Sequence, residues 1–249
     1  MTSKSVVPTI DLSDVDEDRF GYRTAKAARV TRDGLPDVLA YCREHHIQLL
    51  IARCLADDMP AAQAMEQAGF QLMDTLVYYA CTPIEPLQPM QNGRISIRAV
   101  MEGEEDAVTE VAKDAFHGYR FGHYHADPRL DRSACDAVYP SWARALCTTR
   151  DAAREVLVAD NNCAIVGFIG LRLNDPSEGE GILNGVLRAE QGQGVYTFLL
   201  AAGLEWCRQR GAHRFLISTQ LANWRVQQVW ARLGLALADA QYTFHKWFT

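Results

Sequence analysis

Two glycines between an apolar strand and an amphipathic helix constrain the fold of this chain more than any other feature of its sequence. Residues 181–188 have the short apolar run of a buried strand, and the helix that follows repeats apolar residues from Val195 to Trp206 on one face. Gly192 and Gly194 lie at the junction, where glycine permits a positive φ and a close approach of the backbone to a ligand. The first amide groups of a helix have no partner inside it, so this turn predicts an α/β fold with a pocket for phosphate. A turn without any ligand is the alternative, because so short a glycine pattern is common by chance.

The rest of the second part of the chain alternates strands and helices around this turn. We expect strands at residues 94–98, 155–159, 164–171, 215–218 and 241–248, and helices at residues 102–116, 135–146 and 223–233. Pro140 is expected to interrupt the second of these helices, because proline disrupts a helix interior. Residues 120–130 are polar and aromatic without a clear period, which predicts a loop. Trp142 and Trp206 are expected in the core.

The first part of the chain predicts a smaller α/β unit. Residues 1–19 are acidic with few large apolar side chains, which predicts a loose lead-in. Strands are expected at residues 48–54 and 75–79, and helices at residues 35–43 and 59–68. Prolines at every third position from Pro83 to Pro89 predict an extended linker. We therefore expect two domains, at residues 1–90 and 91–249.

An internal repeat relates these two domains. Gly69 and Gly234 differ by 165 positions, and the same offset aligns the helices and strands around them without a gap, although few residues are identical. Coincidence between two helix–strand units is the alternative. The glycine turn has no counterpart in the first copy, where residues 26–30 stand in the place of residues 191–195. The first domain is therefore expected to be a truncated structural copy.

Charge and cysteine usage limit the classes of function. The formal net charge is −6, which argues against a nucleic-acid surface, since such surfaces need clustered lysine and arginine. The seven cysteines contain no C-x-x-C pair, so neither a metal site nor a redox site is predicted. An odd number of cysteines without a visible signal peptide predicts reduced thiols and a cytoplasmic protein. The longest apolar run, residues 198–204, is too short to cross a membrane.

The order of the expected elements and two short motifs resemble the GNAT acyltransferase superfamily. Its pyrophosphate signature is glutamine or arginine, two residues, glycine, one residue, and then glycine or alanine. Gln191 and Gly194 fit this signature, whereas Tyr196 replaces the final small residue. A second motif, an asparagine about eleven residues before a glycine, is matched by Asn223 and Gly234.

The resemblance implies an α/β (α+β) GNAT fold with a mixed central sheet, preceded by a truncated GNAT-like N-terminal lobe. The short first lobe and the aromatic loop make the chain similar to the dTDP-fucosamine acetyltransferase type, which acylates a nucleotide-linked amino sugar. The resemblance also implies an acetyl-CoA (acyl-CoA) site. Its residues would be Val186 and Leu187 beside the pantetheine arm, Gln191, Gly192, Gln193, Gly194, Val195 and Tyr196 around the pyrophosphate, and Asn223 on the cofactor arm. The acceptor would lie under the loop that carries His123, His125, Asp127 and Arg129.

One position departs from the family pattern. The family often places a tyrosine seven residues after the asparagine, where it protonates the leaving thiolate. Here that residue is Trp230, and an indole N–H is not a useful proton donor. Tyr242 and His245 on the last strand, and Tyr196, are the candidates for the missing acid.

The base for the amine has its own candidates. His123 and His125 titrate near neutral pH, and an extended loop would point residues i and i+2 the same way. Glu180, ahead of the central strand, is a candidate for holding a water molecule or the amine. Ordinary loop histidines and a solvated acidic turn are the alternatives.

These inferences predict an acyl-CoA-dependent N-acetyltransferase that acts on the primary amine of a small acceptor, with a nucleotide-linked amino sugar preferred. The alternative is a non-catalytic acyl-CoA-binding or scaffold protein, which the tryptophan in place of tyrosine would explain. Acylation of a protein N-terminus or lysine stays open. No nucleic-acid or membrane partner is expected. The alternating Tyr242, Phe244 and Phe248 are expected to pack in the sheet or to form a homodimer interface.

Overall fold

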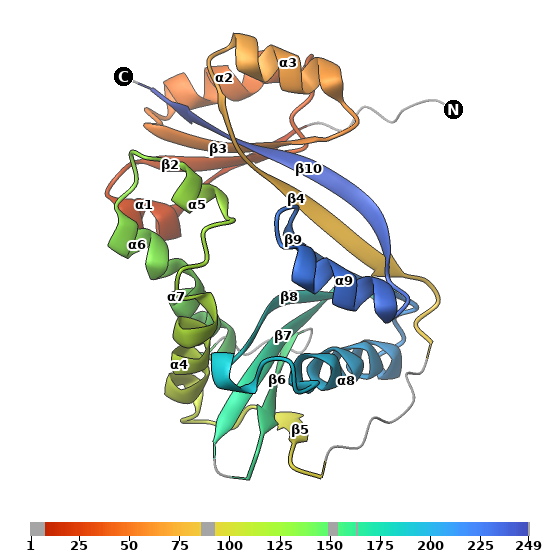
Figure 1. Cartoon of the computed structure of the whole chain (residues 1–249). Helices are drawn as coiled ribbons and strands as arrows, with labels where there is room; N and C mark the ends of the chain where they lie inside the picture. The colour runs from red at the N-terminus through yellow and green to blue at the C-terminus, as the bar shows by residue number, and fades with distance from the viewer. Residues whose placement is uncertain (1–7, 86–92, 149–153, 163, 249) are drawn as a thin grey trace.

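The strands of both halves of the chain join in one mixed sheet (Figure 1). The computed structural model describes residues 8–85, 93–148, 154–162 and 164–248. The strands are β1 (Thr9–Leu12), β2 (Thr24–Ala28), β3 (Leu49–Leu55), β4 (Gln71–Cys81), β5 (Ser96–Ala99), β6 (Arg154–Asp160), β7 (Ile165–Asp175), β8 (Glu178–Val186), β9 (Arg214–Gln220) and β10 (Ala236–Trp247). The helices are α1 (Asp14–Phe20), α2 (Leu35–Glu44), α3 (Met59–Gln67), α4 (Glu105–Phe116), α5 (His123–Ala126), α6 (Arg132–Asp136), α7 (Val138–Thr148), α8 (Val195–Gln209) and α9 (Trp224–Arg232).

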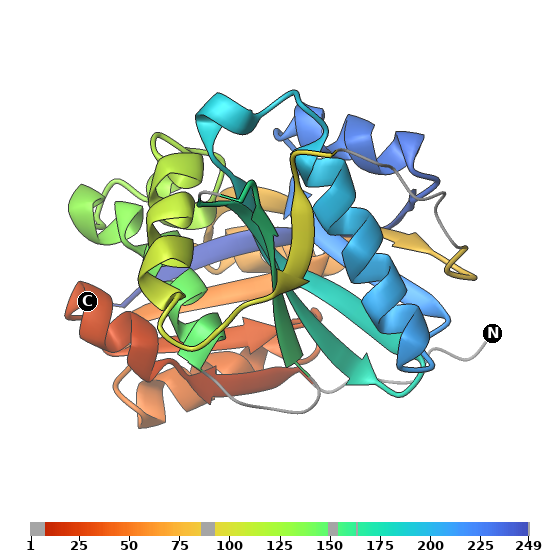
Figure 2. The ribbon, with the colours of Figure 1, turned by 90° about the horizontal axis from the view of Figure 1, so that it is seen from below.

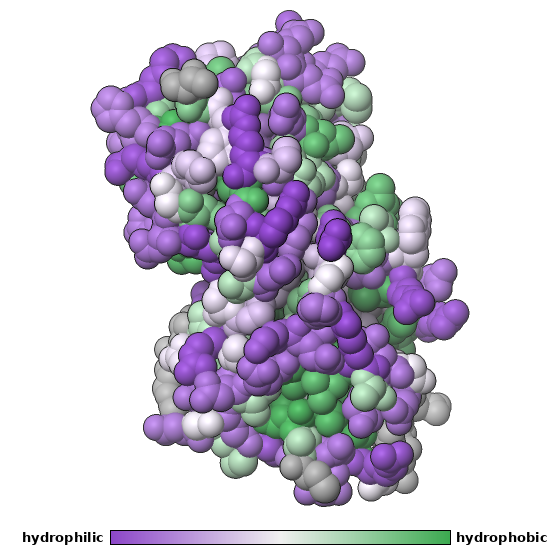
Figure 3. All heavy atoms as spheres, turned by 60° about the vertical axis from the view of Figure 1, so that its left-hand side comes forward, coloured by the Kyte–Doolittle hydropathy of each residue, from purple (hydrophilic) through white to green (hydrophobic). Residues whose placement is uncertain are grey.

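The strand order is β1-β2-β3-β10-β4-β9-β8-β7-β6-β5. The β2–β3 and β8–β9 pairs are parallel, and the other neighbours are antiparallel. Helices α2 and α3 cover the β2–β3 end, and α4 and α8 lie on opposite sides of β7 and β8 (Figures 1 and 2). The predicted α/β (α+β) class with a mixed central sheet is confirmed. One face of the molecule is mainly hydrophilic, and its broadest apolar patch lies in the lower half (Figure 3).

The two halves exchange strands at the centre of the sheet. β10 pairs with β3 of the first half, with Phe244 opposite Ala52. β4 pairs with β9 of the second half, with Tyr79 opposite Ile217. β10 and β4 also pair with each other, between β3 and β9. Neither half therefore completes its part of the sheet without a strand from the other.

The element bounds carry the offset of 165 residues seen in the sequence. α3 and α9 begin at Met59 and Trp224 and end at Gln67 and Arg232. β3 and β9 are related in the same way, and in the β4–β10 pair Leu76 lies opposite Gln241, its counterpart under the same offset. The centre of the sheet thus has approximate two-fold symmetry. That symmetry supports the interpretation of the first half as a truncated copy, and the domain division at residue 90 stays a prediction.

The last strand contributes to the core of the first half. Phe244 of β10 is 1% exposed and belongs to the cluster formed by Val38 of α2, Leu50 of β3 and Met65 of α3. The second half has a separate large cluster centred on α8, which includes Leu199. A residue near the C-terminus therefore supports the fold of the residues near the N-terminus.

Phe244→Ala is expected to lower the free energy of unfolding by about 3–5 kcal/mol, because it removes a buried ring and leaves a cavity in the core of the first half. Urea unfolding followed by circular dichroism measures this change. Leu237→Ala on the same strand is the matched control, because Leu237 is 60% exposed and such sites shift stability by about 0.5 kcal/mol or less. Equal losses in the two variants would contradict a role of β10 in that core.

The acidic lead-in is more ordered than the sequence predicts. Residues 9–12 form β1 and residues 14–20 form α1. The carboxylate of Asp16 is buried, accepts hydrogen bonds from Ser13 and Tyr124 at 2.8 and 2.9 Å, and lies 2.6 Å from Lys26 Nζ. Polar contacts to distant residues order this segment, so apolar periodicity does not reveal it. Lys26, aligned in the sequence with the glycine turn, lies in strand β2 instead.

Three further expectations are corrected. Pro140 does not interrupt a helix, because a new helix, α7, begins at Val138 and the proline lies in its first turn, where it is tolerated. The expected loop at residues 120–130 contains the short helix α5. Trp142 is 41% exposed, whereas Trp206 is buried as predicted. Of the predicted linker, residues 86–92 lie outside the described residues. No helix in the described parts of the chain is long and apolar enough to span a membrane.

Candidate functional site

β8 and β9 diverge in the middle of the sheet. They pair in parallel from Glu178 opposite Arg214 to Gly181 opposite Ile217, where the ladder ends. β8 then continues along β7, and β9 continues along β4. The strands on either side hold the two apart, so a gap opens between them with unpaired backbone groups on its walls.

Backbone alternation decides which groups of β8 face this gap. The Leu187 amide donates to the Val166 carbonyl on the β7 side, and the Leu187 carbonyl accepts from Glu190. In an antiparallel ladder the neighbouring residue then directs its groups the other way, so the N–H and C=O of Val186 face the gap. Of the two residues expected beside a pantetheine arm, Val186 therefore has a free backbone donor, and Leu187 uses both of its groups within the chain.

The glycine turn leads from this gap into α8. Gly192 and Gly194 have φ values of 78° and 85°, which side chains rarely adopt. Gly194 is the N-cap of α8, and no side chain caps the helix. Gln191 donates from Nε2 to the Val186 carbonyl and ties the turn to β8, while Gln193 donates to the Ala189 carbonyl. Open amides at the start of a helix of fifteen residues suit a phosphate group.

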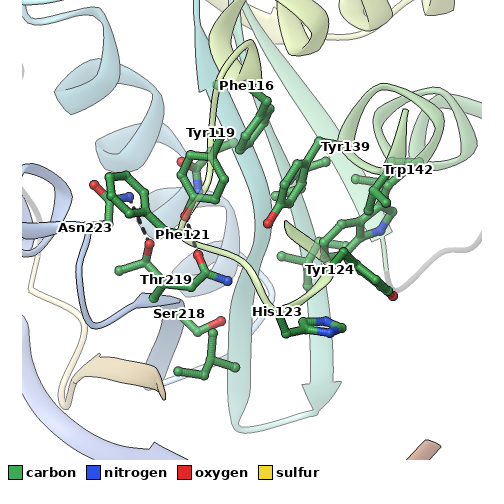
Figure 4. Close-up of a pocket in the computed structure, with 18 of the residues that line it drawn as sticks. Phe116, Tyr119, Phe121, His123, Tyr124, Tyr139, Trp142, Ser218, Thr219 and Asn223 are labelled. Atoms are coloured by element: carbon green, nitrogen blue, oxygen red, sulfur yellow. Dashed lines mark hydrogen bonds between the residues drawn. The ribbon is translucent and has the colours of Figure 1, made fainter. Parts of the chain in front are cut away.

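A cavity of about 1110 Å³ lies beside the gap and draws its walls from both halves of the chain. Val186, Tyr196 and Asn223 line it from the second half, and Lys26 and Arg53 line it from the first. Asn223 is the N-cap residue of α9, but its side chain caps no amide there and instead donates to Thr219 Oγ1 at 3.0 Å (Figure 4). The cavity thus joins the expected cofactor residues to residues that the sequence did not single out.

Aromatic side chains form one wall of this cavity. Phe116, Tyr119, Tyr139 and Trp142 line it from α4, the following loop and α7 (Figure 4). Phe116 and Tyr139 stack with ring centroids 4.2 Å apart, and burial raises the pKa of Tyr119 to about 12. The sequence analysis singled out the aromatic loop, but it placed Trp142 in the core and did not name Tyr139. The spacing of three between these residues on one helix face was the available signal.

Three buried polar groups lie in line: His123 at the cavity, then His245, then Asp127. Asp127 Oδ2 is 2.7 Å from His245 Nδ1, and His245 Nε2 is 2.8 Å from His123 Nδ1. Asp127 and His245 are each 1% exposed, and His123, which lines the cavity, is 7% exposed. Although burial raises the pKa of Asp127, hydrogen bonds from His245, the Arg129 amide and Trp247 lower it below its usual range. Burial, with further contributions from His245, Arg53 and Lys26, holds the pKa of His123 well below its usual value.

The structure separates the other residues of the predicted acceptor loop. His123 to Ala126 form a helical turn, so His125 does not share the direction of His123, and its Nε2 lies 2.9 Å from Asp136. The extended loop assumed for this pair is wrong. Asp127 lies behind His123 and does not line the cavity, and Arg129 stacks over the Trp247 ring at 5.4 Å. Of the four predicted acceptor residues, only His123 lines the cavity.

Tyr242 and His245 lie on opposite faces of β10, because they are an odd number of residues apart in a strand. Tyr242 packs toward Phe244 and the core of the first half and is not among the residues that line the cavity, so the geometry does not support its predicted catalytic role. Tyr242 therefore leaves the set of candidate acids.

Glu180 does line the cavity, where Arg172 lies 2.5 Å from its Oε2.

Trp230, the residue in the family's tyrosine position, is fully buried. Its Nε1 donates to the Tyr196 hydroxyl at 2.7 Å, and both side chains line the cavity. Since that hydroxyl accepts from Trp230, its own proton is free to point elsewhere. Burial raises the pKa of Tyr196, so this proton is present at neutral pH. Tyr196, the residue that breaks the glycine signature, is the strongest remaining candidate for the acid.

Arg53 brings a positive charge to the cavity from the first half. Its Nε donates to Thr243 Oγ1 at 3.2 Å, and among the described residues no carboxylate lies within 4.0 Å of its guanidinium. Lys26, by contrast, is paired with Asp16. No group of three or more His, Cys, Asp or Glu side chains in the described ranges is arranged to hold a metal ion. Among the described residues, Arg53 therefore offers an anion in the cavity a cation with no carboxylate within 4.0 Å, although Asp74 acts on it from a greater distance.

Comparison with known proteins agrees with this geometry. The model of the Acetyltransferase (GNAT) family matches residues 112–235. Spore coat polysaccharide biosynthesis protein SpsD of Bacillus subtilis (strain 168) is 29% identical over 148 residues, which are 58% of this chain and 48% of SpsD. The match thus spans about half the length of that relative.

Solved structures resemble the whole chain in fold. A GCN5-related N-acetyltransferase from Sphaerobacter thermophilus has a TM-score of 0.65 and 18% identity, with 97% of this chain and 76% of that one covered. A conserved protein of unknown function from Staphylococcus epidermidis ATCC 12228 has a TM-score of 0.66 and 16% identity, with coverages of 100% and 94%. At these identities the likeness concerns the fold alone.

Proposed function

The chain is a GNAT-family acetyltransferase, and from that premise we propose that it transfers an acetyl group from acetyl-CoA to the primary amine of a small anionic acceptor. The observation that carries the proposal is the gap between β8 and β9, which opens onto both the uncapped start of α8 and the large cavity. The gap and the turn suit a long phosphorylated thioester, and the cavity leaves room for a second substrate.

Particular groups would hold acetyl-CoA. The open amides from Gly194 to Tyr196 suit the pyrophosphate, because they are helix N-terminal donors without a side-chain cap. The Val186 N–H faces the gap and suits the acyl or pantetheine oxygens. The Asn223 amide lies on the opposite wall. The residues present therefore fit the group.

Acetyl-CoA, when bound, supplies the acetyl group, and the carbon–nitrogen bond to the acceptor forms as the carbon–sulfur bond breaks. The chain must then provide a donor to the acyl oxygen, a proton for the sulfur and a site that accepts protons from the amine. We assign the donor to Val186 N–H and the proton to the Tyr196 hydroxyl, which Trp230 holds in place. Trp230 then supports the reaction, and the scaffold alternative loses the observation that motivated it.

An anionic acceptor is favoured by the charges of the cavity. Arg53 is a cation without a carboxylate partner among the described residues, and Arg225 also lines the cavity. The aromatic wall offers flat surfaces to a base or a sugar ring. A nucleotide-linked amino sugar combines an amine, two phosphates, a base and two sugar rings. The name of the similar SpsD, a spore coat polysaccharide biosynthesis protein, supports a sugar acceptor.

Thiol release from acetyl-CoA tests this function, with dTDP-fucosamine, glucosamine, lysine and spermidine as acceptors. We expect release with the nucleotide sugar in preference to the others. Arg53→Met should raise KM for the nucleotide sugar by about 10-fold to 100-fold, as loss of a charged hydrogen bond implies, and should leave glucosamine nearly unaffected. Arg129→Met is the control, because that side chain lies outside the cavity. No thiol release with any acceptor would refute the proposal.

A further inference from the structure

We propose that Asp127, His245 and His123 form a proton relay that makes His123 Nε2 the base for the acceptor amine. This inference deepens the function proposed above and rests on it. Only His123 lines the cavity, so it is the catalytic residue of the relay. His245 and Asp127 act through its ring and are positioning residues.

The relay is assembled from two distant parts of the chain. Asp127 and His123 belong to the segment around α5, and His245 belongs to β10, where its side chain points to the cavity face of the sheet. The atoms meet at 2.7 and 2.8 Å, and both links are buried. Trp247, two residues after His245 on the same face, donates to the same Asp127 oxygen at 2.8 Å. The Asp127 carboxylate is therefore held in place at the end of the relay that lies away from the cavity.

Asp127 determines which nitrogen donates and which accepts in each hydrogen bond of the relay. An ionised carboxylate only accepts, so His245 Nδ1 carries a hydrogen. In the proposed relay, His245 has no hydrogen on Nε2, so this nitrogen accepts the hydrogen on His123 Nδ1, 2.8 Å away. His123 is left with a lone pair at Nε2, the nitrogen that no described group uses and that can face the cavity. Two histidines that merely packed against each other would not require this arrangement of hydrogens on their rings.

Burial first, and then nearby cations, favour the neutral form of His123. The titratable and charged groups that face it come from each element packed against the ring: Lys26 of β2, Arg53 of β3, Asp74 of β4, Tyr124 of α5 and His245 of β10. The Asp74 carboxylate is near the His123 backbone, whereas the cations act on the ring. A histidine that stays neutral at pH 7 is ready to accept a proton.

The proposed step moves one proton. The N–H bond of the acceptor ammonium breaks, its electron pair stays on nitrogen, and the proton joins His123 Nε2. His123 then carries hydrogens on both nitrogens, and its charge is stabilised through His245 by the Asp127 carboxylate. The amine becomes a neutral nucleophile, and His123 returns the proton to water. No oxidant, reductant or metal is required.

Nitrogen NMR of the 15N-labelled full chain tests the relay without any substrate. Long-range 1H–15N spectra distinguish the tautomers of each imidazole, and His123→Gln and His245→Gln assign the two rings. We expect hydrogens on Nδ1 of both rings at pH 7, with His123 still neutral below pH about 6.5, the usual histidine pKa. A hydrogen on His123 Nε2, or a charged His123 at pH 7, would overturn the relay.

Kinetics with dTDP-fucosamine or glucosamine tests whether the reaction uses the relay. His123→Gln should lower kcat by about 100-fold or more, with acetyl-CoA affinity unchanged. The acid limb of kcat/KM, which lies below pH about 6.5 in the unaltered protein, should disappear. Added imidazole should restore part of the rate to His123→Ala. His245→Gln should lower kcat less and shift the limb, which a merely structural contact would not do.

His125→Gln is the matched control, because His125 sits two residues from His123 and pairs with Asp136 outside the cavity. It should leave kcat and the pH profile unchanged. If the unaltered chain releases thiol but His123→Gln is as fast, the relay is wrong and the proposed function stands. If the unaltered chain releases no thiol with any acceptor, the proposed function fails and the relay has no reaction to serve.

Discussion

Gly194→Glu is expected to weaken acetyl-CoA binding by at least about 100-fold, as measured by titration calorimetry. Gly194 has a φ of 85° at the N-cap of α8, a conformation that glutamate adopts only with strain. The new carboxylate would also lie beside the open amides of the helix and repel a pyrophosphate there. Two effects, one steric and one electrostatic, thus act at the same place.

The backbone strain needs its own control, and α8 provides one at its other end. Gly211 has a φ of 89°, and an added Cβ would meet nothing within 4 Å. Gly211→Glu therefore introduces a similar strain and the same charge, far from the turn. It should reduce the melting temperature about as much as Gly194→Glu and bind acetyl-CoA normally. If both variants bind equally well, the glycine turn is not the cofactor site.

Tyr196→Phe is expected to lower kcat by about 10²–10⁴-fold while acetyl-CoA binding changes little. The substitution keeps the ring but removes the one hydroxyl that accepts from Trp230 and lines the cavity. If this hydroxyl supplies the proton for sulfur, its loss leaves a poor leaving group. Thiol release measured at saturating acetyl-CoA reports the change. A kcat within a few fold of the unaltered value would contradict the assignment.

A double-mutant cycle separates the acid from its support. Trp230→Phe should also slow the reaction, because the Tyr196 hydroxyl loses the donor that orients it. In a Tyr196→Phe background the same change should have no further effect on kcat, since there is no hydroxyl left to orient. Independent, additive losses would show that Trp230 acts on the reaction by another route.

The sequence predicted the elements whose apolar residues repeat with a clear period. α8, α9 and the strands beside them agree with the predictions, apart from a few terminal residues, because each packs one face on a core. α1 was missed for the opposite reason: its buried residue is Asp16, an acid held by Ser13, Lys26 and Tyr124. Such contacts join distant residues and leave no period in the sequence.

The same distinction between local patterns and contacts of distant residues applies to the candidate site. The glycine turn is local, and its positive φ values and uncapped helix follow from adjacent residues. The relay depends on His245 meeting a segment more than a hundred residues earlier, which no local pattern encodes. The sequence alone could have separated Tyr242 from His245, because residues 242 and 245 of one strand must face opposite sides of the sheet. No sequence pattern identified Arg53 as a site residue, since only the fold brings it to the cavity.

The exchange of strands between the two halves determines when the sheet can form during translation. A ribosome finishes β3 and β4 early, yet the strand that lies beside both of them, β10, begins only at Ala236, long after β4 ends at Cys81. Until it arrives, the nascent chain carries two strands with unpaired edges, and such edges readily pair with other chains. The first half is thus open to such pairing during translation itself, until β10 has been synthesised.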